Sequence, residues 1–189
     1  MPNMSRSGKF ILRDLPGSGN RVDILCRSLQ ACFEWGPVFW QKSKLEFLAV
    51  IADELVLRFS NPSLQQQMGE VWWASAIQES LKGHPPPFVV CHTASLSEVL
   101  EDIVKHSSSN IWALDERGFE ISDWALYRSA SQNSFMLGDH HGFDSNTQKV
   151  MKHLGIDVIS LGVTSYLGSH CVATIISKME GVEEENERG

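Results

Sequence analysis

The sequence lacks the features that most quickly assign a chain to a class of protein. It contains no apolar run of membrane length, because Phe47–Phe59, the longest sheltered stretch, is broken by Asp53 and Glu54. We find no signal-peptide pattern, and a dinucleotide fingerprint, a Walker loop and an HExxH motif are also missing. We therefore expect neither a membrane-spanning helix nor one of the common nucleotide or zinc-protease sites.

Cysteine is scarce and shows no pairing pattern. The four cysteines are Cys26, Cys32, Cys91 and Cys171, and none belongs to a CxxC pair. Such usage is typical of reduced thiols. We expect a cytoplasmic protein without disulfides.

Positive charge is also limited, since 16 Lys and Arg residues face 23 Asp and Glu residues and the net charge is −7. This balance argues against a general nucleic-acid binder. The first 30 residues are an exception, because they hold five cations and only two acidic residues. Residues 180–189 hold five Glu against Arg188, which is typical of a solvated acidic tail.

Apolar residues make up 42% of the chain, enough for a sizeable core, and their patterns alternate between strand and helix. Seven strands are expected, at Lys9–Leu15, Glu46–Ile51, Leu55–Phe59, Phe88–Cys91, Ile111–Leu114, Phe135–Leu137 and Val158–Leu161. Five helices are expected: one capped by Asn20 and ended by Gly36-Pro37, one starting at Asn61-Pro62-Ser63 with Met68 and Val71 on its buried face, and three starting near Ser95, Asp144 and Ser165. Asp115–Gly118 reads as a turn. The alternation predicts an α/β fold with a mainly parallel sheet in a single domain spanning 1–189.

The carboxyl ends of two expected strands are candidates for a ligand site. In open α/β sheets, ligands bind just beyond the carboxyl ends of the strands. Here those ends read Leu137-Gly138-Asp139 and Leu161-Gly162-Val163-Thr164-Ser165. We therefore expect a small-molecule site formed by these two loops.

Three groups of residues each allow two interpretations. His140-His141 beside Asp139, with His170-Cys171, could suggest a metal site, but the spacing fits no common zinc pattern, and we predict no metal. Cys171 lies early in a helix, where a thiolate is favoured, yet no base is placed near it, so we favour a packing or cofactor contact. The six tryptophans could stack on RNA bases, but Trp72 and Trp112 lie in apolar patterns typical of a core.

Three blocks of the sequence together resemble a known family. They are Phe10–Arg27, Leu137–Phe143 and Ser160–Cys171, with the sequences FILRDLPGSGNRVDILCR, LGDHHGF and SLGVTSYLGSHC. In this order they resemble the TrmY family, the tRNA (pseudouridine-N1)-methyltransferases of the SPOUT superfamily. The segment Asn61–Pro87 matches less well, which leaves the identity of the RNA open.

The resemblance implies a SPOUT-type parallel sheet flanked by helices, with a deep trefoil knot in the C-terminal third, a homodimer, and S-adenosylmethionine bound in the knot. The knot and cofactor region would span about 110–180. The cofactor-binding residues implied are Leu114, Leu137, Gly138, Leu161, Gly162, Val163, Thr164, Ser165, Tyr166 and Cys171.

On this reading, the reaction requires a group that accepts the proton leaving N1 of pseudouridine. Asp14 and Asp23 flank the glycine-containing turn and are our candidates, although capping or ion pairing would explain them equally. Arg21 and Arg27 are expected to hold RNA phosphates or the cofactor's carboxylate, unless they pair with nearby acids. Two alternatives remain open: methylation of another RNA, and a non-catalytic knotted dimer that binds the cofactor.

Overall fold

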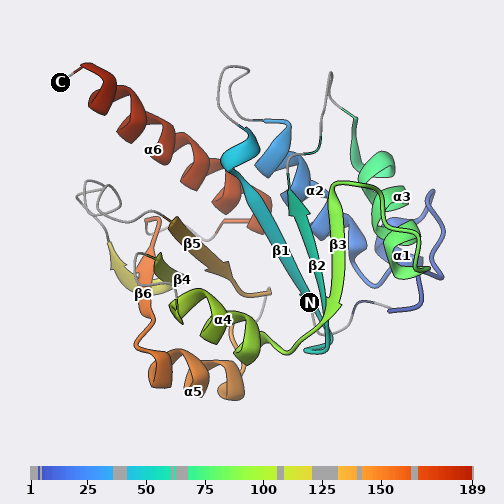
Figure 1. Cartoon of the computed structure of the whole chain (residues 1–189), viewed down its shortest axis with the longest axis horizontal. Coiled ribbons are helices and arrows are strands. Elements are labelled where there is room, and N and C mark those ends of the chain that lie inside the picture. The colour runs from blue at the N-terminus through green and yellow to red at the C-terminus, as the bar shows by residue number, and fades with distance from the viewer. Residues whose placement is uncertain are drawn as a thin grey trace. The chain divides into compact units, whose positions relative to one another are not determined.

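The structure is a computed structural model that describes residues 4, 6–35, 42–60, 62, 68–105, 109–120, 132–139, 142–162 and 166–188. Its elements divide between two compact units, Met1–Ser95 and Leu96–Gly189 (Figure 1). Each unit is described by itself below.

The first unit is built on a three-stranded antiparallel sheet in the order β1-β2-β3. The strands are β1 (Glu46–Ile51), β2 (Leu55–Ser60) and β3 (Val89–Thr93). Ala52 and Asp53 adopt left-handed backbone angles in the β1–β2 turn. The two strand predictions on either side of this turn are confirmed, but the prediction of a mainly parallel sheet is wrong for this half of the chain.

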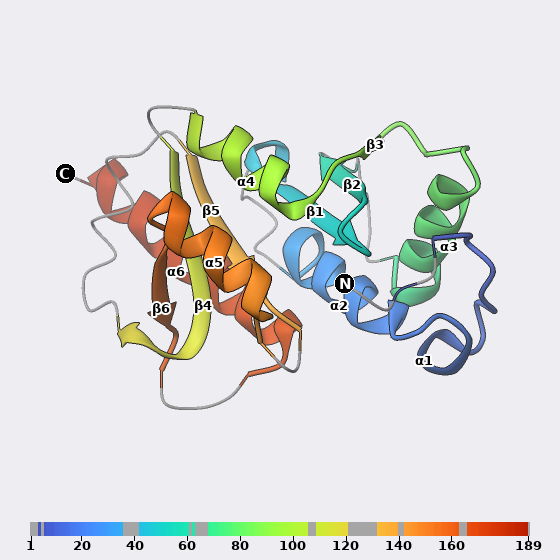
Figure 2. The ribbon, with the colours of Figure 1, turned by 90° about the horizontal axis from the view of Figure 1, so that it is seen from below.

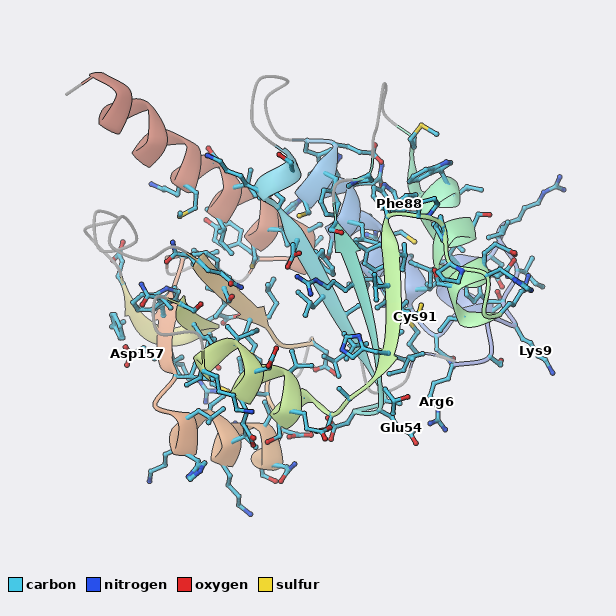
Figure 3. The ribbon with its side chains drawn as sticks, in the orientation of Figure 1. Arg6, Lys9, Glu54, Phe88, Cys91 and Asp157 are labelled. Atoms are coloured by element: carbon cyan, nitrogen blue, oxygen red, sulfur yellow. The ribbon has the colours of Figure 1, made fainter. Side chains whose placement is uncertain are left out.

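Two helices, α2 (Val22–Phe33) and α3 (Glu70–Leu81), cover one face of this sheet (Figures 1 and 2). Trp73 lies at the centre of the resulting core, where its ring stacks on Phe33 and meets Phe59 edge-on. Figure 3 shows Phe88 at the start of β3, where its ring stacks on Trp72. The prediction that Trp72 belongs to the apolar interior agrees with this arrangement.

The N-terminal segment differs from its prediction. Lys9–Leu15 is not a strand: the Asp14 amide bonds to the Ile11 carbonyl in a turn, and the short helix α1 (Leu15–Ser18) follows. Pro16 stands where a first helical turn tolerates it, and Asp14 caps that turn. The carbonyl of Phe10 accepts a hydrogen bond from the Gln78 side chain at 2.7 Å, so α3 rather than a neighbouring strand satisfies it.

Both long helices of this unit begin later than predicted. Asn20 does not cap α2, because Arg21 is the N-cap residue and makes no side-chain capping bond. The helix α3 begins at Glu70 rather than near Asn61, since Gly69 has a φ of 82°, which no helix accommodates. Its buried face contains Trp73 and Ile77, whereas Val71 is exposed; Asn61 and Ser63 lie outside the described residues.

The second unit contains a three-stranded parallel sheet in the order β5-β4-β6. The strands are β4 (Ser109–Glu120), β5 (Gln132–Leu137) and β6 (Asp157–Ser160). Here the prediction of parallel strands is confirmed.

Helices lie on both faces of this parallel sheet (Figure 2). On one face, α4 (Leu96–Lys105) and α5 (Ser145–Leu154) contribute Leu100 and Met151 to a cluster around Ala113. On the other, Met179 of α6 (Gly168–Arg188) packs with Ile159. The unit is therefore a three-layer α/β/α arrangement.

Strand β4 contains an irregularity at its centre. Ile159 of β6 is the register partner of both Leu114 and Phe119, so the four residues between them leave the ladder. Gly118 lies directly against β6, because an added Cβ would stand 2.5 Å from the carbonyl carbon of Ile159. The predicted turn at Asp115–Gly118 corresponds to this excursion, although the strand continues beyond it.

Candidate functional site

The carboxyl ends of the parallel strands form the first candidate site. Leu114 of β4 is in register with Leu137 of β5 and with Ile159 of β6. The three strands therefore reach a common edge, and Leu114, Leu137 and Leu161 are all half-buried there. The structure thus brings together the strand ends that the sequence singled out.

The loop after β5 contains a close approach between two glycines. A Cβ on Gly138 would lie 2.6 Å from the carbonyl oxygen of Gly142. The turn is closed by the Gly142 amide, which donates to the Asp139 carbonyl at 2.9 Å. Glycine at position 138 is required by this turn itself. His140 and His141 lie outside the described residues.

The loop after β6 is organised by Ser160. Its hydroxyl donates to the Gly162 carbonyl at 2.8 Å and accepts from the Gly162 amide at 3.1 Å. Gly162 has a φ of 133°, a conformation that L side chains rarely adopt. Among the described residues nothing lies within 4 Å of a Cβ built on it.

The start of α6 completes this edge. Tyr166 and Leu167 are exposed, Cys171 is half-buried in the first turn, and Val163, Thr164 and Ser165 lie outside the described residues. Burial raises the pKa of the Cys171 thiol, and the charge of Glu116 adds to this, against a smaller opposing effect of its own backbone amide. A neutral thiol suits a packing or ligand contact better than nucleophilic attack.

The β4 excursion adds an ordered arginine beside the strand ends. Asp115 accepts from the Arg117 amide at 2.9 Å, from Nε at 3.0 Å and from Nη2 at 3.1 Å. These bonds hold the pKa of Asp115 below its ordinary value. Sequence reasoning missed this pair, for which the only signal was an acid and an arginine two residues apart in a turn.

The N-terminal segment holds the second candidate site, and Asp14 has a local role within it. Its exposed carboxylate accepts the Gly17 amide at 3.2 Å and caps α1. Capping was one of the two interpretations that the sequence left open. No described ion pair joins Asp14 to Arg21 or Arg27.

Asp23 is the centre of an ion-pair cluster in this segment. Its carboxylate, only 2% exposed, accepts from Arg21 Nε at 3.1 Å and from Arg21 Nη2 at 3.3 Å. It also accepts from Arg27 Nη2, and Arg27 Nε lies 3.5 Å from Glu70. Both arginines pair with Asp23, the alternative that the sequence left open, while the Arg21 side chain remains 59% exposed. No sequence pattern indicated Glu70.

The electrostatic balance at Asp23 follows from these contacts. Burial is the largest influence and raises its pKa, but the hydrogen bonds and charges of Arg21 and Arg27 together outweigh it. The net result is a pKa below the ordinary value, and the pKa of Arg21 is raised in turn by its bond to Asp23. Asp23 is therefore a weak proton acceptor in this setting.

The described ranges contain no group of three or more His, Cys, Asp or Glu side chains able to hold a metal ion. Within the same ranges, no helix is both long and apolar enough to cross a bilayer.

The common edge of the parallel strands fits the adenosine-containing cofactor that the family resemblance implies. Half-buried leucines at Leu114 and Leu137 offer apolar contact for an aromatic base. The positive φ of Gly162 and the space beside it leave room for a ligand against the backbone.

Comparisons with known proteins extend the resemblance over most of the chain. Residues 2–183 match the profile of a family described as "Putative SAM-dependent RNA methyltransferase". The tRNA (pseudouridine(54)-N(1))-methyltransferase of Thermococcus gammatolerans is 30% identical over 179 residues, covering 88% of this chain and 87% of the relative. The enzymes of the same name from Pyrococcus abyssi and Methanosarcina mazei are 26% and 27% identical, covering 88% and 95% of this chain and 87% of each relative.

A solved structure supports the fold. The chain is similar to Archaeoglobus fulgidus Nep1 bound to S-adenosylhomocysteine, with a TM-score of 0.61 and 15% identity, covering 88% of this chain and 72% of that one.

Proposed function

Because this chain belongs to the family of SAM-dependent RNA methyltransferases, we propose that it methylates N1 of pseudouridine at position 54 of tRNA. The resemblance inferred from the three sequence blocks is confirmed, as is S-adenosylmethionine as the methyl donor. The choice of tRNA and of this base rests on the names of relatives that align along nearly the full length of the chain.

The observation that carries the proposal within the structure is the convergence of the parallel strand ends. Leu114, Leu137 and Ile159 lie in register at one edge, and no described atom lies within 4 Å of a Cβ built on Gly162. S-adenosylmethionine supplies an already activated methyl group, so the chain's task is to bind it and to align the acceptor nitrogen.

We assign cofactor binding to the residues around this edge, as the family resemblance implies. Leu114, Leu137 and Leu161 contact the apolar parts of the ligand, and the loops at Gly138 and Gly162 contact its polar edges. Tyr166 and Cys171 contact it from the start of α6, and Val163, Thr164 and Ser165 belong to the same proposed set. Because the Gly162 amide already donates to Ser160 in this structure, a ligand would share or replace that bond.

Proton removal from N1 is assigned to Asp14 rather than Asp23. Asp14 is exposed, and among the described residues its carboxylate bonds only to the Gly17 amide, whereas Asp23 is buried between two arginines. An accessible carboxylate is the better acceptor for a proton on a bound nucleobase.

The assembly implied by the family belongs to the same proposal. The chain would act as a homodimer in the cytoplasm, as a single SPOUT domain with a trefoil knot in its C-terminal third. A partner's N-terminal segment would then bring cations to a cofactor edge that has few of its own.

The test is methyl transfer to defined RNA. Purified protein with S-adenosylmethionine is incubated with a tRNA transcript carrying pseudouridine at position 54, and with a transcript carrying uridine there. Nucleoside mass spectrometry should find N1-methylpseudouridine in the first alone.

Each other outcome selects a different function. Methylation of total cellular RNA but not of the transcript would indicate another RNA target. Calorimetric binding of S-adenosylmethionine without transfer to any RNA would favour a non-catalytic binding protein. If the protein neither binds S-adenosylmethionine nor transfers a methyl group to any RNA, its assignment as a methyltransferase is refuted.

A further inference from the structure

Asp23 is placed where a carboxylate holds other groups rather than accepts a proton. It is almost fully buried, and among the described residues the groups that bond to its carboxylate are the guanidinium groups of Arg21 and Arg27. A buried anion of this kind stays charged and fixes the geometry of the cations around it.

The two arginines differ in how far they extend into solvent. Arg27 is 35% exposed and is tied at three points: to the Asp23 carboxylate, to the Asp23 carbonyl at 3.4 Å and to Glu70 at 3.5 Å. Arg21 is 59% exposed and bonds to Asp23 alone among the described residues. Arg27 therefore anchors the cluster, while Arg21 is its solvent-facing member.

The backbone presents Arg21 in a fixed way. Asn20 and Arg21 have φ values of 48° and 69°, so two consecutive non-glycine residues adopt the left-handed conformation before α2. Such a conformation carries a cost of about 1–3 kcal/mol per residue and persists only where surrounding contacts enforce it. The bonds to Asp23 run through Nε and Nη2, and no described residue accepts a hydrogen bond from the Nη1 amino group.

The charge of the N-terminal segment favours an anion. Its first 30 residues hold three further cations, of which Arg6 pairs with Glu54, while Lys9 and Arg13 are exposed, in a chain that is acidic overall. A guanidinium oriented by a carboxylate loses less side-chain entropy when it binds an anion than a freely rotating one does.

From these relations we propose that Asp23 is a positioning residue: anchored by Arg27, it holds Arg21 in the orientation that binds a phosphate of the substrate RNA. The inference rests on the proposed function for the identity of the ligand. Asp23, a candidate proton acceptor from the sequence, becomes a positioning residue. Arg27, a candidate RNA contact from the sequence, becomes the residue that anchors Asp23.

Charge and positioning make opposite predictions for Asp23→Asn. Removing the carboxylate makes the segment more positive, so electrostatics alone would tighten RNA binding. If Asp23 positions Arg21, binding weakens instead, by about tenfold, the effect of one charge-assisted hydrogen bond. The double variant Asp23→Asn with Arg21→Ala should then bind no more weakly than Arg21→Ala alone.

The experiment measures binding of a T-arm hairpin RNA containing pseudouridine at position 54, over a series of salt concentrations. Arg21→Ala should weaken binding about tenfold and reduce the slope of log K against log salt by about 0.7. The calorimetric affinity for S-adenosylmethionine should stay at the wild-type value. Asp23→Asn that binds the hairpin as tightly as wild type, or more tightly, would overturn the proposal.

A second pair of variants decides the matter if Asp23→Asn does not fold. Arg21→Lys keeps the charge but loses the two-point bond to Asp23, and should weaken RNA binding severalfold with an unchanged salt slope. Arg13→Lys is the matched control, since Arg13 is exposed in the same segment and no described carboxylate bonds to it. Equal effects of the two lysine variants would refute positioning. Wild-type protein that neither binds nor methylates the hairpin would refute the proposed function itself, whatever the variants do.

Discussion

The carboxylate of Glu34, one residue beyond α2, accepts a hydrogen bond from the indole Nε1 of Trp73 in α3. It also accepts the amides of Met68 at 3.1 Å and Gly69 at 3.5 Å, just before α3 begins. Gly69, the N-cap residue of α3, has no side chain, and Glu34 satisfies its amide and that of Met68 from the end of α2. One buried side chain therefore fixes how the two helices of the first unit meet.

Glu34→Ala should lower the free energy of unfolding by about 1–3 kcal/mol, because the buried indole N–H loses its acceptor. Glu34→Gln should lose less, since its carbonyl oxygen still accepts from Trp73. Denaturant unfolding followed by tryptophan fluorescence measures both. Identical stability of wild type and Glu34→Ala would show that the contact contributes nothing.

Gly162→Ala should weaken binding of S-adenosylmethionine. Alanine at a φ of 133° carries a strain of about 1 kcal/mol or more, and the backbone at the proposed cofactor loop must move to relieve it. Isothermal titration calorimetry measures the affinity.

Gly155→Ala is the matched control for that variant. Gly155 also has a positive φ, at 67°, and nothing described lies within 4 Å of its added Cβ, but it ends α5 before β6 begins. Both variants should lose similar stability, and only Gly162→Ala should lose cofactor affinity. Equal losses of affinity would place the cofactor elsewhere.

Cys26 and Cys32 should not react with a thiol reagent in the folded protein. Burial raises the pKa of each to about 12, so the thiolate is absent at pH 8. In a Cys91→Ser, Cys171→Ser background, Ellman's reagent should find no thiol until denaturant is added, and then two. Rapid labelling of the native double variant would contradict the buried placement of α2.

The ion pairs of Asp23 should make the protein less stable in acid. Its folded pKa lies below the ordinary value of about 3.9, so the stabilisation is fully present above that value and is lost as the pH falls through the folded pKa. Melting temperatures of wild type and Asp23→Asn should therefore differ near neutral pH and approach each other below about pH 4. Arg21→Ala should also lower the melting temperature near neutral pH, by less than Asp23→Asn does. If wild type and Asp23→Asn still differ in melting temperature in strong acid, the ionised Asp23 carboxylate is not the source of the difference.

The sequence predicted the parallel half of the fold well because its signals are local. Phe135–Leu137 and Val158–Leu161 are short apolar runs, and Asp144 caps α5 through the Thr147 amide at 2.7 Å, as expected. It failed at Lys9–Leu15, where alternating residues suggested a strand. A capping acid and a distant glutamine, Gln78, satisfy that backbone instead, and no local pattern reports such a partner.

The candidate site was predictable in position but not in its contacts. Strand ends followed by glycine located the cofactor edge, because parallel strands end at a common side of a sheet. The roles of Asp23, Arg21 and Arg27 depend on which atoms meet, and the sequence left capping, ion pairing and catalysis equally open. The contacts of Arg27 with both Asp23 and Glu70 arise from the packing of α2 against α3, which no spacing encodes.

The excursion in β4 has a consequence for how this chain tolerates changes in length. Ile159 pairs with β4 both before and after Asp115–Gly118. Residues inserted into this excursion should therefore enlarge it without shifting the register of the sheet. An insertion between Ser109 and Leu114 would instead turn each later side chain of that ladder to the opposite face. Provided that Gly118 keeps its place against β6, the excursion is where relatives of this chain can grow or shorten a loop beside the strand ends while preserving the core.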